Sequence, residues 1–156
     1  MRTIAYVDGY NLYYSRLRGG PFKWLDLHTL LQGILHIQDP AMQLARVRYF
    51  TSPVIARLAS HGPASVEAQH AYLRALQLTK VEVTLGRHQL EPGKAPRHLP
   101  GVAPSRQDTV PVWHLDEKET DVRLALAMYR DARMGLMEQA VLISSDTDLV
   151  PALEAL

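Results

Sequence analysis

The chain has 156 residues, of which 47% are hydrophobic, and its 17 basic residues nearly balance its 16 acidic residues. This size predicts one domain with a true hydrophobic core, and a net charge of +1 argues against strong non-specific binding to nucleic acid. The absence of cysteine excludes disulfides and thiolate metal sites. With neither a signal peptide nor an apolar run of membrane-spanning length, the sequence predicts a cytoplasmic protein with no membrane partner.

The first half of the chain alternates short apolar strands with helices. Residues 3–8 are predicted to form a buried strand, because this β-branched and apolar run is too short for a helix. Further strands are predicted at 44–51 and 81–86. Helices are predicted at 11–18, at 25–37 behind a cap at Asp26, and at 65–79.

The second half opens with a different kind of segment. Residues 91–111 are rich in proline and glycine and are predicted to form a long loop, either a substrate-facing flap or an insertion. The best helical pattern follows at 116–134, then a strand at 140–144 and a helix from Thr147. This order predicts a single α/β domain over 1–156, with a central, mostly parallel sheet flanked by helices. Such a sheet often carries one more strand, so the end at Leu156 suggests a truncation.

Three aspartates stand at the predicted ends of buried strands. Asp8 ends the first strand, and Asp146 and Asp148 follow the last one. In parallel sheets ligands bind outside the carboxyl ends of the strands, so these carboxylates are predicted to lie at one edge. The surrounding strings are Asp8-Gly9-Tyr10-Asn11 and Ser144-Ser145-Asp146-Thr147-Asp148.

A fourth acid, Asp121, lies early in the helix predicted at 116–134. A capping box formed by Asp116 and Glu119 and the helix dipole would explain the neighbouring acids, but Asp121 lies beyond the first turn. It precedes a face predicted to pack on the sheet, made of Val122, Ala125, Leu126 and Tyr129.

Each acid alone also has a plain structural interpretation as a cap, a turn residue or a partner of a helix dipole. Together they would repel one another and raise one another's pKa values. A divalent cation relieves that repulsion, and oxygen ligands suit Mg²⁺ or Mn²⁺.

The strings around Asp8 and Asp146, with Glu117-Lys118-Glu119-Thr120-Asp121-Val122 between them, resemble the NYN domain of the PIN-like nuclease superfamily, most closely its bacterial LabA-like subgroup. The resemblance covers essentially the whole chain and implies a three-layer, PIN-like (Rossmann-like) fold. It implies a Mg²⁺ or Mn²⁺ site at Asp8, Asp121, Asp146 and Asp148, which would also be the catalytic residues.

The implied activity is that of a ribonuclease, in which metal-activated water hydrolyses a phosphodiester bond. Lys118 would contact a phosphate, and Asn11, Ser144 and Thr147 would organise the site. The predicted partner is nucleic acid, with RNA favoured over DNA, and a homodimer is compatible with the superfamily. The substrate contacts are predicted to come from Arg16, Lys94, Arg97, Arg106 and Arg123.

Two alternatives remain open from the residues. One is a non-catalytic regulator that keeps the acidic site and binds RNA or protein without cleaving it. The other is a phosphatase of the haloacid dehalogenase type, which needs a second aspartate two residues after the first, where this chain has Tyr10.

Overall fold

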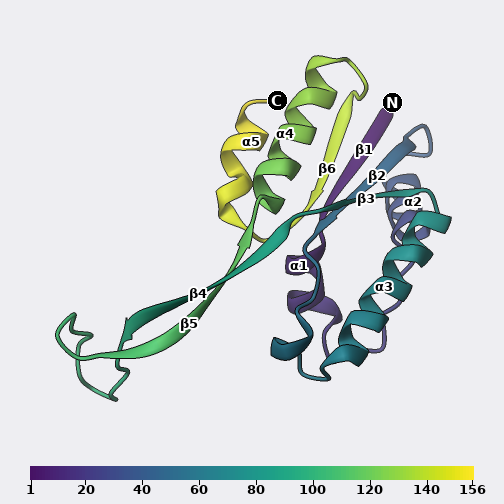
Figure 1. Ribbon diagram of the computed structural model, residues 1–156. Coiled ribbons are helices and arrows are strands. Elements are labelled where there is room, and N and C mark those ends of the chain that lie inside the picture. The colour runs from purple at the N-terminus through teal and green to yellow at the C-terminus, as the bar shows by residue number, and fades with distance from the viewer.

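The computed structural model describes residues 1–156, and Figure 1 shows a layered body from which a long two-stranded ribbon projects. The elements follow in the order β1 (Arg2–Asp8), α1 (Gly9–Leu12), η1 (Tyr13–Leu17), α2 (Leu27–Gln38), β2 (Gln43–Thr51), η2 (Ala56–Leu58), α3 (Pro63–Leu78), β3 (Val81–Leu85), β4 (Arg87–Pro96), β5 (Thr109–Lys118), α4 (Thr120–Arg133), β6 (Gln139–Ile143), η3 (Thr147–Leu149) and α5 (Val150–Glu154).

The body is built on a four-stranded sheet in the order β3-β2-β1-β6, and every pair of neighbours in it is parallel. This confirms the predicted α/β architecture with a parallel central sheet. The strand order reverses between β1 and β6, so the crevice between their carboxyl ends is the expected position for a ligand. Asp8 ends β1 at this point, and residues 144–148 follow β6 there.

Helices cover both faces of the sheet, and strand β1 shows why. Its side chains alternate between the faces, with Ala5 and Val7 packed against α2 and α3, and Ile4 and Tyr6 packed against α4. A strand buried on both faces reads as a continuous apolar run rather than an alternating one. The run at 3–8 is therefore the sequence signature of the sheet's interior.

Three polar side chains, those of Tyr6, Arg48 and Asp131, interact on the α4 side of the core. The Tyr6 hydroxyl donates to Asp131 Oδ2 at 2.7 Å, and Arg48 Nη1 lies 3.2 Å from the same oxygen. Asp131 lies on α4, and its side chain is only 4% exposed. The arginine and the phenol compensate the carboxylate for its lost hydration.

Helix α2 begins as predicted, behind Asp26, whose side chain accepts from the backbone N–H of Thr29. The segment after β1 is different from the prediction, because the single helix predicted at 11–18 divides into α1 and the π-helical turn η1. Gly9 begins α1 with its Cα against the ring of Tyr49, where any Cβ would collide with that ring.

The helix predicted at 116–134 is wrong at its start, because residues 116–118 belong to strand β5 and α4 begins at Thr120. The predicted capping box is absent, since Glu119 makes no side-chain cap and instead turns the chain in the left-handed region, at φ 75°. The sheet-facing side was also misassigned. Val122, Leu126 and Tyr129 are exposed, whereas Thr120, Leu124, Met128 and Asp131 are the buried members.

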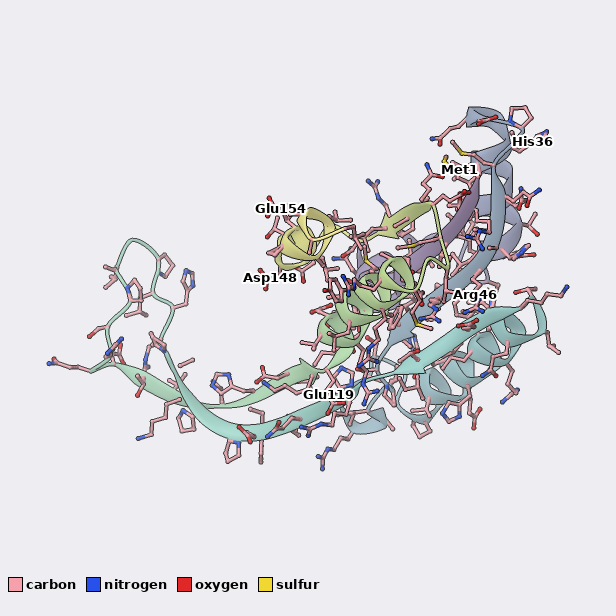
Figure 2. All side chains as sticks on the ribbon, turned by 90° about the horizontal axis from the view of Figure 1, so that it is seen from above. Met1, His36, Arg46, Glu119, Asp148 and Glu154 are labelled. Atoms are coloured by element: carbon pink, nitrogen blue, oxygen red, sulfur yellow. The ribbon has the colours of Figure 1, made fainter.

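The predicted loop at 91–111 is also wrong, because β4 and β5 form an antiparallel ribbon with residues 97–108 at its tip. Prolines cannot donate to a strand ladder, which is why this segment resembled a loop. Pro92, Pro96 and Pro111 all lie in the cross-strand pairs that alternate with the hydrogen-bonded pairs of the ladder. At these positions neither strand donates an N–H to the other, so the prolines remove no hydrogen bond from the ladder. Figure 2 shows the ribbon leaving the body near Glu119.

None of the helices combines the length and the apolar character that crossing a membrane requires.

Candidate functional site

The site lies where β1 and β6 end side by side. Asp8 is 5% exposed, and both of its oxygens accept hydrogen bonds. The Asn11 backbone N–H donates to Oδ1 at 2.9 Å, and the Ser144 hydroxyl donates to Oδ2 at 2.9 Å. Asn11 Oδ1 in turn accepts from the backbone N–H and the hydroxyl of Ser145, at 3.1 and 3.0 Å. These bonds join the ends of two strands that are far apart in the sequence.

The same hydrogen-bond network continues into the segment after β6. The Asp146 backbone N–H donates to the Ser144 hydroxyl at 3.0 Å, and Asp146 Oδ1 accepts from the Asp148 backbone N–H at 2.9 Å. Asp146 therefore caps η3, while Asp148 stands exposed in the first turn of η3. Thr147 is exposed at the start of this turn.

Burial and repulsion set the charge state of the cluster. Burial raises the pKa of Asp8, Glu117 and Asp146 raise it further, and the bonds from Asn11 and Ser144 oppose that rise. Asp121 is exposed in the first turn of α4. Its partial desolvation raises its pKa to about 6, and repulsion from Asp8, Asp146, Glu117 and Asp148 contributes in the same direction.

Glu117 is a member of the site that the sequence did not reveal. It was grouped with the acids of a helix start, but it lies on β5 at the root of the ribbon, where its Oε1 accepts from the Thr120 hydroxyl at 2.8 Å. Thr120 is buried and also lies 3.1 Å from the Ser52 hydroxyl. Gly86 permits this contact, because a Cβ there would collide with Thr120 and Ser52. Only recognition of strand β5 could have placed Glu117 beside Asp8.

A groove of about 360 Å³ opens beside these acids, where the ribbon joins the body. Its lining combines aromatic, apolar and charged side chains: Tyr10, His88, Leu115, Asp116, Glu117 and Lys118. The rings of Tyr10 and His88 meet edge to face at 6.4 Å. His88 Nδ1 lies 2.8 Å from the Pro53 carbonyl oxygen, which in the neutral ring fixes the proton on Nδ1 and leaves Nε2 an acceptor.

The predicted cationic residues are not gathered around the acids. Lys118 Nζ pairs with Asp116 at 3.0 Å, and Arg123 pairs with Glu119 at 2.7 Å. Arg16 lies on η1. Lys94, Arg97 and Arg106 all lie on the outer part of the ribbon, where Arg97 pairs with Asp108 at 3.1 Å.

The predicted Mg²⁺ or Mn²⁺ site is wrong, because no group of three or more His, Cys, Asp or Glu side chains is arranged to hold a metal ion. The physical reason lies in the hydrogen bonds. Both oxygens of Asp8 and one oxygen of Asp146 already accept bonds from neighbouring donors, which orient these carboxylates and stabilise their charge without a cation.

The chain is similar to 6-hydroxy-3-succinoylpyridine 3-monooxygenase HspA of Pseudomonas putida (strain DSM 28022 / S16), with 38% identity over 99% of this chain. The chain spans about half the length of this relative, 55% of it. No protein-family profile and no solved structure match the chain.

This similarity overturns the resemblance drawn from the aspartate motifs. A relative at 38% identity over almost the whole chain is named as a monooxygenase, and no nuclease family matches. The NYN and PIN-like assignment, the ribonuclease activity and the hydrolytic role of a metal were therefore wrong. Binding of RNA is a separate expectation and stays a prediction.

Proposed function

We propose that this chain takes part in the hydroxylation of a hydroxypyridine that carries a keto-acid side chain. The similarity to the P. putida monooxygenase over 99% of the chain carries this proposal. The acidic crevice and its groove support it, because they combine an aromatic wall with a carboxylate of raised pKa. Concave sites with a few convergent polar groups are the usual positions for small ligands.

A monooxygenase places one oxygen atom of dioxygen in the substrate and reduces the other to water with two electrons from a donor. A hydroxypyridine becomes more reactive toward an electrophilic oxygen when it loses the proton of its hydroxyl or ring N–H, because the negative charge spreads into the ring. The chemistry therefore calls for a base beside the ring. General bases work best when their pKa lies near the working pH.

Asp121 suits this role. With a pKa of about 6 it is ionised at neutral pH, yet it is more basic than an ordinary aspartate. It is exposed and so open to substrate, whereas Asp8 is buried and both of its oxygens are engaged. Asp8, Asp146 and Asp148 then act as positioning residues, because they hold the strand ends together and raise the pKa of Asp121.

The groove supplies the binding surface in this proposal. Its volume of about 360 Å³ lies near the lower end of the roughly 300–1,000 Å³ range of ligand sites, which suits a single ring with a short side chain. Tyr10 and Leu115 offer apolar contact to the ring. Glu117 can accept from a ring N–H, and Lys118 can pair with the carboxylate of the side chain in exchange for Asp116.

Activation of dioxygen is the work of a cofactor in most enzymes of this kind. We therefore assign the chain the binding and deprotonation of the ring.

The test has two readouts. Binding of 6-hydroxy-3-succinoylpyridine is measured by calorimetry, without dioxygen or an electron donor. Turnover is measured as substrate-dependent oxygen uptake with reduced nicotinamide as the electron donor. Labelled dioxygen then shows whether its oxygen atom enters the product. Asp121→Asn should lower turnover about 10²- to 10⁴-fold and change binding little. Asp108→Asn, in an exposed ion pair on the ribbon, is the matched control.

The pH profile separates a base from a merely structural acid. Turnover should fall as the pH drops below about 6, where Asp121 becomes protonated, and this limb should disappear in Asp121→Asn. No oxygen uptake with any hydroxypyridine, together with no binding, would overturn the proposed function. Binding with normal turnover in Asp121→Asn would overturn only the role of Asp121.

A further inference from the structure

The ribbon formed by β4 and β5 lines the groove only at its root, and its outer part is the largest feature that the proposed function does not use. Its strands pair only with each other, and Figures 1 and 2 show it extending from the body with no other element along most of its length. A two-stranded ribbon alone in water is marginally stable, because neither face is covered. Trp113 is nevertheless 67% exposed in the middle of it.

One face of the ribbon has an ordered sequence of side chains. Residues opposite each other on antiparallel strands share a face, and so do residues two apart on one strand. From the root to the tip this face carries the pairs His88–Glu117, Leu90–Leu115, Pro92–Trp113 and Lys94–Pro111. The face is therefore acidic at the root, apolar in the centre and basic toward the tip.

The charges at both ends lack partners within the chain. Glu117 belongs to the acidic crevice, where neither it nor Asp8, Asp121, Asp146 or Asp148 takes part in any salt bridge of the structure. At the other end Lys94 and Arg106 are also without a salt bridge. In the tip region only Arg97 is paired, with Asp108.

We propose that two copies of this chain pair through this ribbon face, with the ribbons antiparallel about a two-fold axis between the Trp113–Pro92 and Leu115–Leu90 pairs. This arrangement places Trp113 against Leu115 of a second copy and brings Lys94 near its Glu117. The basic tip of each copy then lies over the acidic crevice of the other, so the dimer covers the groove to which the proposed function assigns the substrate, and association and substrate binding exclude each other. A face that is acidic at one end and basic at the other is complementary to itself under such an axis, which is the condition for a closed two-fold dimer.

The size of the face sets the expected strength. Ten residues per strand give a ribbon about 33 Å long, and two strands give a width of about 10 Å. The product, roughly 330 Å² per copy, is well below the roughly 800 Å² per partner of a standard stable interface. The dimer is therefore reversible, and its ion pairs make it weaker in high salt.

The first experiment is sedimentation equilibrium of the full chain at low and high ionic strength. A reversible monomer–dimer equilibrium that shifts to monomer in high salt is expected. Lys94→Glu alone and Glu117→Lys alone should each shift the equilibrium about tenfold or more toward monomer. The double variant Lys94→Glu/Glu117→Lys should recover most of the association, since the charges then exchange places.

The second experiment uses the absence of cysteine in the chain. Leu115→Cys lies near the proposed axis, so a short thiol-to-thiol cross-linker should join two copies. Val102→Cys is the control, because the two tips lie at opposite ends of the paired ribbons. Leu115 is 44% exposed and Val102 is 62% exposed, so greater reactivity of the thiol cannot explain preferential linking at position 115.

Three outcomes would overturn the proposal: a monomer at every concentration, an oligomer that is unaffected by both charge reversals, or equal linking of the two cysteine variants. Circular dichroism and urea unfolding check that each variant retains the folded body, which matters most for Glu117 because it accepts a hydrogen bond from the buried Thr120. The proposal does not rest on the hydroxylation, because the association state and the cross-linking decide it whether or not the chain turns over a substrate.

Discussion

The sheet of the body and the ribbon are both continuous strand ladders, yet they differ in what covers them. Strand β1 is paired on both edges and packed by helices on both faces, and Ala5, Tyr6 and Val7 are fully buried. Strands β4 and β5 form an antiparallel ladder with each other, and no layer lies above or below most of their length. Backbone hydrogen bonds therefore define the shape of both regions, whereas most of the free energy of unfolding comes from the side chains buried in the body.

The largest expected contrast comes from the same substitution in the two regions. Leu124 is fully buried between α4 and the sheet, so Leu124→Ala should lower the free energy of unfolding by about 3–4 kcal/mol. Leu115 is 44% exposed on the ribbon, so Leu115→Ala should cost about 0.5 kcal/mol or less. Urea unfolding at low protein concentration measures both. Equal losses would mean that the ribbon is part of the cooperative core.

Ion pairs provide the second contrast. Asp131→Ala leaves Arg48 and the Tyr6 hydroxyl without their buried partner, and we expect a loss of about 2–3 kcal/mol. Asp108→Ala removes the exposed partner of Arg97 and should change the unfolding free energy by about 0.5 kcal/mol or less. Thermal unfolding of both variants is the measurement. If Asp131→Ala did not lower the stability, the buried interactions of Asp131 with Arg48 and Tyr6 would not stabilise the fold.

Asp121→Asn gives a smaller effect with a pH signature. Because the pKa of Asp121 is raised from 3.8 to about 6 on folding, the folded chain holds the proton more tightly and ionisation destabilises it. Asparagine removes that cost, so the variant should gain about 1 kcal/mol at pH 7, a value reduced for solvent screening. The gain should shrink between pH 6 and pH 4 and vanish below. If the difference in unfolding free energy between the variant and the unmodified chain stayed constant across this pH range, the pKa of Asp121 would not be raised in the folded chain.

The smallest effect is expected at the ribbon tip. Replacing residues 98–107 by a two-residue Asn-Gly turn should leave the urea midpoint of the body nearly unchanged, within about 0.5 kcal/mol in free energy, since no core residue lies there. Amide exchange in β4 and β5 should be much faster than in β1 both before and after the replacement. If the amides of the ribbon in dilute monomer were as well protected from exchange as those of β1, the two regions would not differ in stability.

The sequence predicted the strands of the sheet and helix α2 well because their local signals agree with the packing. The apolar run at 3–8 is a strand buried on both faces, and Asp26 caps α2 through Thr29. Placing Asp8 and Asp146 at the carboxyl ends of neighbouring strands followed from parallel topology alone.

The ribbon and its consequences could not be predicted in the same way. Pro92, Pro96 and Pro111 indicate a loop unless the register that accommodates them is known. Because the helical pattern extends back over residues 116–118, the end of β5, it places Glu117 at a helix start rather than in the site, and it places Val122 on the buried face. The activity failed for another reason: carboxylates at the strand ends of an α/β sheet serve many unrelated reactions, so their spacing does not identify a chemistry.

The hydrogen bonds that join Asn11 to Ser145 and Ser144 to Asp8 determine when the site can form during protein synthesis. Asp8 and Ser144 are separated by 136 residues, and β6 is synthesised after the other three strands of its sheet. While the ribosome is still making α4, Asp8 has no serine to donate to it. The crevice therefore comes into being only when β6 docks against β1, so a chain still lacking β6 cannot carry the assembled crevice.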